Sequence, residues 1–274
     1  MRNESVSSVS VSDGGSASMP AISINGVGKT YHTRDGELSA IDRVDVRIER
    51  GSFVAILGPS GCGKSTLLKM LAGLERISSG SIDLLGRQVL EPRRDVGIAF
   101  QSPVLFPWRT VLDNVLLPSE VQGTDRAAAL VAARELLRLV GLADFEKKYP
   151  WELSGGMQQR VAIARSLVND PPVLLMDEPF GALDAMTRDQ MNLELQRIWL
   201  KTRNTVVLIT HSIPEAVFLA DRVLVMSGRP GRIIDDITIE SPRPRSMELL
   251  GSPEFGAHVT RIRKLFNVNG GTSV

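Results

Sequence analysis

A continuous apolar run, Phe53-Val-Ala-Ile-Leu57, leads directly into the glycine-rich stretch Gly58-Pro-Ser-Gly-Cys-Gly-Lys-Ser-Thr66. Such a run is typical of a strand buried on both faces, as in a parallel sheet. Apolar residues between positions 67 and 71 recur at helical spacing, and Gly73 ends that pattern, so a helix is expected after the glycines. A strand, a glycine loop and a helix in this order predict an α/β fold with a mostly parallel sheet.

The glycine loop, residues 58–66, matches the pattern G-x-x-x-x-G-K-[ST]. Its glycines free the backbone to turn N–H groups inward around phosphates. Lys64 would bring a positive charge to those phosphates, and the Ser65 hydroxyl would bind Mg²⁺. A chance glycine turn is the alternative, but both flanking elements occur where the motif requires them. The predicted nucleotide-binding residues are Gly58, Pro59, Ser60, Gly61, Cys62, Gly63, Lys64, Ser65 and Thr66, with Cys62 acting through its backbone.

A second glycine turn occurs in Leu153-Ser-Gly-Gly-Met-Gln-Gln-Arg160, which we call the signature segment. Apolar residues after it recur at helical spacing, so Ser154 is predicted to open a helix. A helix N-terminus with adjacent glycines attracts an anion, because its backbone N–H groups are unpaired and its dipole is positive there. The chain therefore contains a second turn that can bind phosphate, in addition to the glycine loop.

Two neighbouring acids, Asp177 and Glu178, follow the apolar run Val173-Leu-Leu-Met176. An aspartate at the end of a buried strand can hold Mg²⁺ through water, as the corresponding acid does in enzymes with this glycine loop. Glu178 is then placed to orient and deprotonate an attacking water. The alternative is a solvated strand end, which the apolar strand and the glycine loop disfavour.

Composition excludes several other classes of protein. The chain has 274 residues, 43% of them hydrophobic, so it can bury a substantial core. Its 32 basic and 31 acidic residues nearly cancel and offer no argument for a nucleic-acid partner. No apolar run reaches the roughly 18 residues that span a bilayer, and the polar start lacks the apolar centre of a secretion signal, so a cytosolic protein is expected. The lone Cys62 excludes an internal disulfide.

The pattern along the chain predicts three regions. Residues 1–20 are expected to form a disordered tail, and residues 21–240 a single ATPase domain. Residues 241–274 would form a linker and a helix at 253–266. Within the domain, residues 102–169 are mostly helical and are predicted to form a subdomain inserted into the α/β core, with helices opened by Thr110 and Ser154 and a third at 127–140. The core then resumes with a helix at 187–200 and strands at 205–210 and 221–226.

These motifs, in this order, resemble the ATP-binding-cassette family, the ATPase subunits of ABC transporters. The resemblance covers about residues 22–239, nearly the whole folded chain. It implies an ABC ATPase core of the P-loop NTPase type with a mostly parallel sheet, an N-terminal antiparallel β subdomain and an inserted helical subdomain. It also implies that ATP is hydrolysed and that ATP and Mg²⁺ are the cofactors.

The resemblance assigns roles to four further residues. Gln101 falls at the position that contacts Mg²⁺ and the attacking water. Asp184, in Ala182-Leu-Asp184, resembles the D-loop at a dimer interface. His211 follows the predicted strand at 205–210 and resembles the switch histidine that contacts the γ-phosphate, and Tyr31 occupies the place of the aromatic residue that stacks on adenine. Each of these assignments is weak alone, since such residues are usually local packing or hydrogen-bonding groups. Their occurrence together, in the order found in the family, strengthens all four assignments.

The resemblance also explains the second glycine turn. In the family, the serine and glycine positions of the signature segment act in trans on the ATP of a second subunit, which here implies a homodimer. The residues concerned are Ser154, Gly155, Gly156 and Gln158. Met157 stands where glutamine is commonest in the family, a difference expected to have little consequence.

A single cassette without a membrane span predicts separate transmembrane permease subunits, indirectly a solute-binding protein, and a peripheral position on the cytoplasmic face of the inner membrane. The runs at residues 101–115 and 226–233 look like the nitrate, sulfonate and taurine importer subgroup, which implies a small anionic solute. Trp108 is the expected permease contact, whereas Leu105 and Phe106 are equally consistent with core positions.

A soluble ABC ATPase of DNA repair or translation is the alternative function. Repair types place a very long coiled coil between the glycine loop and the signature segment, whereas fewer than about one hundred residues separate them here. Translation types usually carry two cassettes in one chain.

Overall fold

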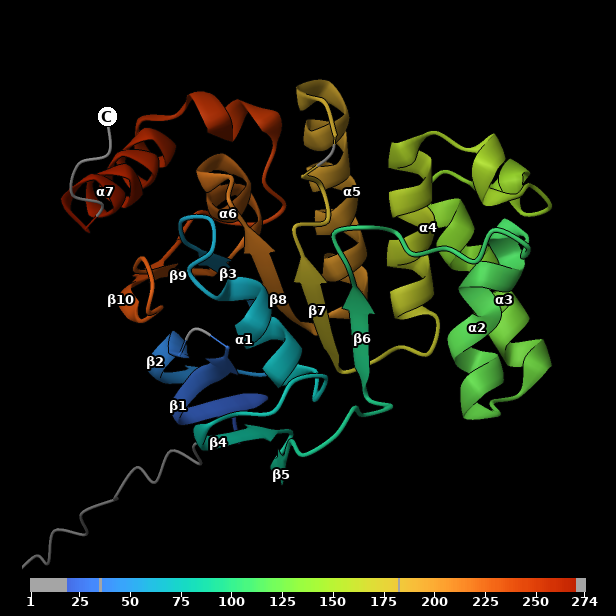
Figure 1. Ribbon diagram of the computed structural model, residues 1–274. Coiled ribbons are helices and arrows are strands. Elements are labelled where there is room, and N and C mark those ends of the chain that lie inside the picture. The colour runs from blue at the N-terminus through green and yellow to red at the C-terminus, as the bar shows by residue number, and fades with distance from the viewer. Residues whose placement is uncertain (1–18, 35, 182, 270–274) are drawn as a thin grey trace, which may run out of the picture.

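Two β-sheets with a helix between them form the frame of the protein in a computed structural model (Figure 1). The structure describes residues 19–34, 36–181 and 183–269, so the first 18 residues of the predicted tail lie outside the described residues. One sheet has six strands in the order β10-β9-β3-β8-β7-β6, and the other has four in the order β2-β1-β4-β5. The predicted α/β class with a mostly parallel sheet is confirmed.

The six-stranded sheet is parallel except for its β10 edge. Its strands are β3 (Phe53–Leu57), β6 (Val96–Ala99), β7 (Val173–Asp177), β8 (Thr205–Thr210), β9 (Arg222–Met226) and β10 (Ile233–Thr238). Every residue of β3, β7 and β8 is buried, as expected for central parallel strands covered on both faces. The carboxyl ends of these three strands therefore meet at one edge, where the polar residues that follow them gather.

The four-stranded sheet is antiparallel and contains β1 (Ile22–Thr33), β2 (Gly36–Ile48), β4 (Ser79–Leu84) and β5 (Arg87–Gln88). Helix α1 (Lys64–Leu71) packs between this sheet and the parallel sheet. Val54 and Ile56 of β3 share a buried cluster with α1, whereas the alternate residues of β3 join a second cluster on the opposite face. Strand β3 thus separates two halves of the core, and the glycine loop at its end is held from both sides.

The predicted helical region follows β6 and precedes β7 along the chain, and it lies beside the β6 edge of the parallel sheet (Figure 1). It contains α2 (Val111–Gln122), α3 (Arg126–Leu139), the short 3₁₀ turns η1 (Ala143–Phe145) and η2 (Pro150–Glu152), and α4 (Gly155–Leu167). The Thr110 hydroxyl accepts a hydrogen bond from the Asp113 N–H at 3.1 Å and caps α2, as the sequence predicted. Helices α2 and α4 pack together, which brings the signature segment to the same side of the molecule as the strand ends.

Helix α6 (Ile213–Leu219) and strand β10 were missed in the sequence analysis, as was the two-residue strand β5. Helix α6 has only seven residues, too few for a helical period to stand out. Strand β10 pairs at the sheet edge and only its Ile237 is buried, and the adjacent pair Asp235-Asp236 interrupts the apolar–polar alternation that predicts a strand. Helix α5 spans Ala185–Thr202. Helix α7 (Pro253–Asn269) follows the 3₁₀ turn η3 (Met247–Gly251), and the Ser252 hydroxyl caps its first turn by accepting from the Phe255 N–H.

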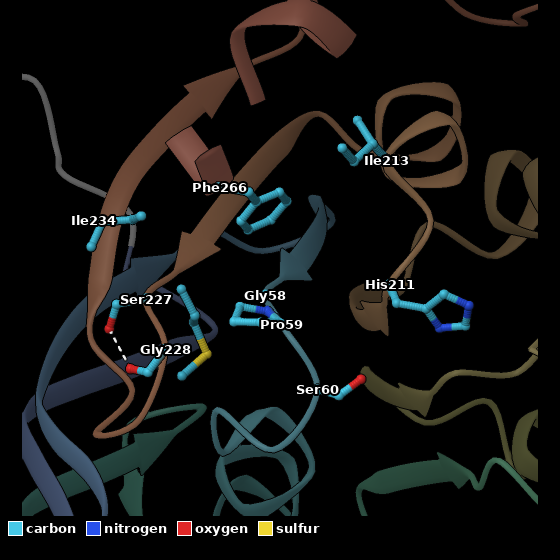
Figure 2. Close-up of a pocket in the computed structure, with 10 residues that line it drawn as sticks. Gly58, Pro59, Ser60, His211, Ile213, Ser227, Gly228, Ile234 and Phe266 are labelled. Atoms are coloured by element: carbon cyan, nitrogen blue, oxygen red, sulfur yellow. Dashed lines mark hydrogen bonds between the residues drawn. The ribbon is translucent and has the colours of Figure 1, made fainter. Parts of the chain in front are cut away.

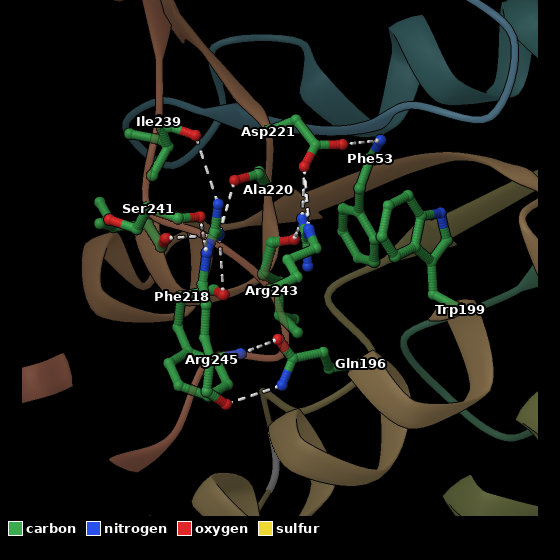
Figure 3. Close-up of polar contacts among 12 residues, drawn as sticks. Phe53, Gln196, Trp199, Phe218, Ala220, Asp221, Ile239, Ser241, Arg243 and Arg245 are labelled. Carbon is green, nitrogen blue, oxygen red and sulfur yellow. Dashed lines mark hydrogen bonds and ion pairs between the residues drawn. The ribbon is translucent and has the colours of Figure 1, made fainter. Parts of the chain in front are cut away.

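The segment between β10 and α7 fastens α6 in place through a buried arginine (Figure 3). Arg245 is 3% exposed, and its guanidinium donates to the backbone carbonyls of residues 217, 218 and 220 at the end of α6. Its backbone exchanges two hydrogen bonds with the Gln196 side chain, at 2.6 and 2.8 Å. Burial lowers the pKa of Arg245 to about 10, so it stays charged at neutral pH. The C-terminal segment therefore fixes the helix that follows His211.

Replacing Arg245 with methionine is expected to destabilise the fold by about 3 kcal/mol or more, because several buried carbonyls lose their donor while the apolar volume is kept. Urea unfolding measures the difference. Arg263→Met, at an exposed position of α7, is the matched control and should change stability little. Equal midpoints for the two variants would contradict a role for Arg245 in holding α6.

Candidate active site

The glycine loop joins β3 to α1 and depends on Gly63 for its shape. Gly63 has φ of +104° and precedes the first residue of α1. A β-carbon there would lie 2.9 Å from Cγ1 of Ile41 and 3.0 Å from the carbonyl oxygen of Ala40, closer than side chains pack. The loop therefore turns tightly against β2 and delivers the N-terminus of α1 to the sheet edge.

Lys64 lies across the loop rather than in solvent. Its side chain is buried, and Nζ donates to the carbonyl oxygens of Gly58 and Pro59 at 2.9 and 3.0 Å. Cys62 is 1% exposed, its thiol packs inside the loop near Gly58, and its sulfur lies 3.9 Å from Nζ of Lys64. The loop thus presents one buried positive charge surrounded by backbone dipoles.

Ser65 and Asp177 meet at the next position. The Ser65 hydroxyl donates to Oδ1 of Asp177 at 3.0 Å, joining the first turn of α1 to the end of β7. Burial raises the pKa of Asp177 above its usual value, the hydrogen bond from Ser65 opposes that rise, and Glu178 adds to it. Because burial favours the protonated form of this carboxyl group, additional positive charge near it would stabilise the anion.

Gln101, Glu178 and His211 converge beside this pair. Oε2 of Glu178 accepts from Nε2 of Gln101 at 3.3 Å and lies 3.2 Å from Nδ1 of His211. Glu178 has φ of +44°, which is uncommon for a residue with a side chain and is found at functional sites. The three residues come from the ends of β6, β7 and β8 in turn, and the parallel sheet is what brings them together.

A cavity of about 350 Å³ lies between Gln101 and Glu178 and the antiparallel sheet, and His211 is not among its lining residues. Tyr31, which the family resemblance assigns to the adenine ring, lies on its wall. The lining residues are Tyr31, Leu38, Ala40, Ser60, Gly61, Gly63, Lys64, Ser65, Thr66, Gln101, Glu178 and Arg229. Arg229, from the turn after β9, was not expected there from the sequence.

A second cavity of about 310 Å³ lies on the other side of the glycine loop (Figure 2). Ile213, Met226, Ile234 and Phe266 give it an apolar wall, with Pro59 facing them and His211 at one side. Its lining contains no lysine or arginine. A phosphate chain needs cations and backbone donors, so the 350 Å³ cavity is the better site for one.

The signature segment lies away from both cavities. Ser154 caps α4 by accepting from the Met157 N–H at 3.3 Å, which confirms the predicted helix start. Ser154 and Gly155 are exposed, and a β-carbon on Gly155 would meet nothing within 4 Å. Gln158 instead donates to the carbonyl of Pro150 at 2.9 Å. None of these residues lines the 350 Å³ cavity of its own chain.

Asp184 also lies outside the cavity and caps α5. Its Oδ1 accepts from the Thr187 N–H at 3.0 Å and its Oδ2 from the Thr187 hydroxyl at 2.6 Å. These bonds lower the pKa of Asp184. Ala182, the first residue of the predicted D-loop, lies outside the described residues.

Glu215 supports the turn that carries His211, a role the sequence did not reveal. Its Oε2 accepts from the Thr210 hydroxyl at 3.1 Å, and that hydroxyl accepts from the Ser212 N–H at 3.0 Å. Glu215 is 4% exposed, and burial raises its pKa to about 7. The only advance signal was its position three residues after Ser212, in a pattern typical of a helix start.

The polar groups suit a magnesium ion that also binds phosphate. Mg²⁺ usually takes one or two carboxylates together with substrate phosphates and water, and Ser65, Asp177 and Gln101 offer a hydroxyl, a carboxylate and an amide oxygen. In the part of the chain that the structure describes, no group of three or more histidine, cysteine or acidic side chains could hold a metal by itself. Among the same residues, no helix is long and apolar enough to cross a bilayer.

Comparison with known proteins agrees with this geometry. The family model for ABC transporters matches residues 41–181. The chain is 47% identical over 245 residues to the taurine import ATP-binding protein of Rhizobium johnstonii, covering 88% of this chain and 91% of that protein. It is 43% identical over 250 residues to the nitrate import ATP-binding protein of Synechocystis, covering 89% and 94%.

A solved structure is similar as well. A dimeric ATP-binding cassette in a post-hydrolysis state, bound to ADP and phosphate, superposes with a TM-score of 0.72 at 32% identity. The match covers 81% of this chain and the whole of that one. The resemblance stated from the motifs is confirmed: the chain belongs to the ABC transporter family, as an ATP-binding ATPase cassette.

Proposed function

We propose that this chain is the ATP-hydrolysing subunit of an importer for a small anionic solute such as nitrate, a sulfonate or taurine. The observation that carries the catalytic part is the convergence of Gln101, Glu178 and His211 beside the Ser65–Asp177 pair. The relatives named for taurine and nitrate import support the choice of solute class. Separate transmembrane permease subunits would form the pathway for the solute, and this chain would bind them peripherally at the cytoplasmic face of the inner membrane. A solute-binding protein would act through the permease.

The DNA-repair alternative finds no support in the described helices. ABC ATPases of the DNA-repair type carry a long coiled coil, and the described part of the chain would have to contain one for this function. The longest helix within residues 19–34, 36–181 and 183–269 is α5, with 18 residues, and the region between the glycine loop and the signature segment holds only short helices. An importer subunit therefore remains the better proposal.

In this proposal the 350 Å³ cavity holds ATP. Tyr31 stacks on adenine, and the backbone N–H groups of the glycine loop and Lys64 bind the phosphates. Ser65, Asp177 and Gln101 hold the Mg²⁺, which neutralises charge on the phosphates when bound. Lys64 reaches the phosphates by leaving the carbonyls of Gly58 and Pro59, a movement of one side chain.

Hydrolysis then depends on Glu178. Its carboxylate accepts a proton from water while the water oxygen attacks the γ-phosphorus and the bond to the ADP oxygen breaks. Gln101 and His211, both on Oε2 of Glu178, fix the direction of that carboxylate, and His211 also contacts the γ-phosphate. Glu215 and Thr210 hold the turn from which His211 projects.

A second copy of the chain completes each site. Ser154, Gly155, Gly156 and Gln158 lie outside the cavity of their own chain, so their phosphate-seeking helix end is free to cap the ATP of a partner. Asp184 would lie at the same interface. The dimeric cassette with ADP and phosphate supports this arrangement. ATP then closes the dimer, and hydrolysis reopens it.

The proposed permease contact lies beside Gln101. A hollow of about 500 Å³ is lined by Val104, Phe106 and Val121, and Trp108 next to it is 70% exposed. Leu105 packs against the core instead, as one of the two interpretations of the sequence expected. Arg165 donates to the carbonyls of Pro103 and Val104 and so fixes the loop that forms this wall.

Replacing Trp108 with alanine is expected to reduce solute-stimulated ATP hydrolysis about tenfold in the assembled transporter, because an exposed aromatic anchor at an interface is worth more than 1 kcal/mol. The unstimulated hydrolysis of the isolated cassette should be unchanged. Trp151→Ala removes another exposed tryptophan, 65% exposed and outside the hollow, as the matched control. Equal stimulation in the two variants would contradict the contact.

Co-purification with the permease, followed by ATPase assays with nitrate, taurine and an alkanesulfonate, tests the solute class. We expect one of these anions to stimulate hydrolysis. Stimulation by none of them, in a complex that a different solute does stimulate, would contradict it.

A further inference from the structure

The turn at residues 227–232 is wedged between the glycine loop and β2. The Gly231 N–H donates to the carbonyl of Ala40, and the Asp42 N–H donates to the carbonyl of Gly231, both at 3.0 Å. A β-carbon on Gly231 would lie 2.2 Å from the carbonyl oxygen of Cys62, so only glycine lets the turn approach the loop this closely. The turn is thereby fixed against the wall of the 350 Å³ cavity.

Arg229 projects from this turn onto the glycine loop. Its Nη2 and Nε donate to the carbonyl oxygen of Gly61 at 2.9 and 3.2 Å, and the residue lines the cavity together with Tyr31 and Lys64. Gly61 offers a neutral acceptor, and within the described residues Arg229 has no carboxylate within ion-pair distance. Arg232, three residues later, pairs with Asp42 instead. The two arginines of one turn therefore differ: one has its counter-charge, and the other lies open to the cavity.

The charged groups that line the cavity indicate what the charge of Arg229 could bind. Its charged lining residues are Lys64, Glu178 and Arg229. A nucleoside triphosphate carries several negative charges, and a guanidinium binds phosphate oxygens more strongly than it binds a neutral carbonyl. We propose that Arg229 is a further nucleotide-binding residue, whose guanidinium moves from the Gly61 carbonyl to the phosphate chain of ATP. The inference rests on the proposed function, because it requires the nucleotide to occupy this cavity.

Titration calorimetry with Mg-ATP tests the assignment. Arg229→Gln keeps a donor for the Gly61 carbonyl but loses the charge, and should weaken ATP binding about tenfold. Arg229→Lys keeps the charge and should recover part of that loss. Arg232→Gln, in the same turn but outside the cavity, is the matched control and should bind ATP within about twofold of the parent protein.

A purely structural role for Arg229 would give a different result. The midpoint of thermal unfolding without nucleotide would then fall for Arg229→Gln, and lysine would not restore ATP binding. Lys64→Ala separates this inference from the proposed site. If Lys64→Ala abolishes ATP binding while Arg229→Gln binds normally, the Arg229 assignment is wrong and the cavity stands. If both variants bind ATP normally, the cavity is not the nucleotide site.

Discussion

Replacing Glu178 with glutamine is expected to slow ATP hydrolysis at least about a hundredfold, the range over which a general base contributes. Glutamine has nearly the same shape and can still bond Gln101 and His211, so the site should keep its geometry. It cannot accept the proton of the attacking water. ATP therefore still binds but is not consumed, and the closed dimer that ATP holds together should accumulate.

Gel filtration with and without Mg-ATP measures this outcome together with a phosphate-release assay. The Glu178→Gln protein should shift to the dimer position with ATP and stay there. Glu240→Gln, at an exposed position after β10, is the matched control and should turn over ATP like the parent protein. Fast phosphate release from Glu178→Gln would sink the assignment of Glu178 as the base.

Replacing Ser154 with arginine is expected to abolish hydrolysis by damaging the ATP held by the partner copy, not the ATP of its own chain. Ser154 lies outside the cavity formed by its own glycine loop. The larger cation would block the approach of the exposed helix end of α4 to the partner's phosphates. Loss of the helix cap adds about 1 kcal/mol of destabilisation, which a thermal unfolding curve checks separately.

Mixing the Ser154→Arg protein with the Lys64→Ala protein tests whether the signature segment acts on the ATP of the partner or on that of its own chain. Each variant alone should be inactive. A mixed dimer has one site built from an intact glycine loop and an intact signature segment, so an equal mixture should recover up to about one quarter of the parent activity. Ser154→Ala protein mixed with Lys64→Ala shows how much of any loss comes from the helix cap. If the signature segment served its own chain, mixing Ser154→Arg with Lys64→Ala would restore nothing.

The features predicted correctly from the sequence are those whose chemistry is local. The glycine loop shows its strand, its turn and its helix within about twenty residues, and Asp177 and Glu178 directly follow an apolar strand. The strand before His211, β8, could be predicted for the same reason, because it is a short apolar run followed directly by a polar residue. Tyr31 could be placed only through the family resemblance, because nothing in its immediate sequence distinguishes it from surface packing.

The features that were missed depend on contacts between distant segments. Arg229 meets Gly61 across 168 residues, and Arg245 meets Gln196 across 49. The pattern of apolar and polar residues within one segment does not predict a partner so far away in the sequence. Helix α6 is too short to be recognised alone, and strand β10 lacks a regular alternation because two aspartates are adjacent; both are stabilised by tertiary packing. The sequence identified the chemistry, whereas the supports that hold it in place required the fold.

The buried Arg245 has a consequence for the order in which the protein becomes active during synthesis. The glycine loop and the signature segment leave the ribosome long before residue 245, yet the end of α6, and with it the turn that carries His211, acquires its donor only when Arg245 arrives. Strand β3, which carries the glycine loop, pairs with β8 and β9, so the nucleotide loop and the turn that carries His211 both reach their final form late in synthesis. We expect hydrolysis to begin only after residue 245 has been made and has folded onto α6, which would keep chains that lack this segment from consuming ATP.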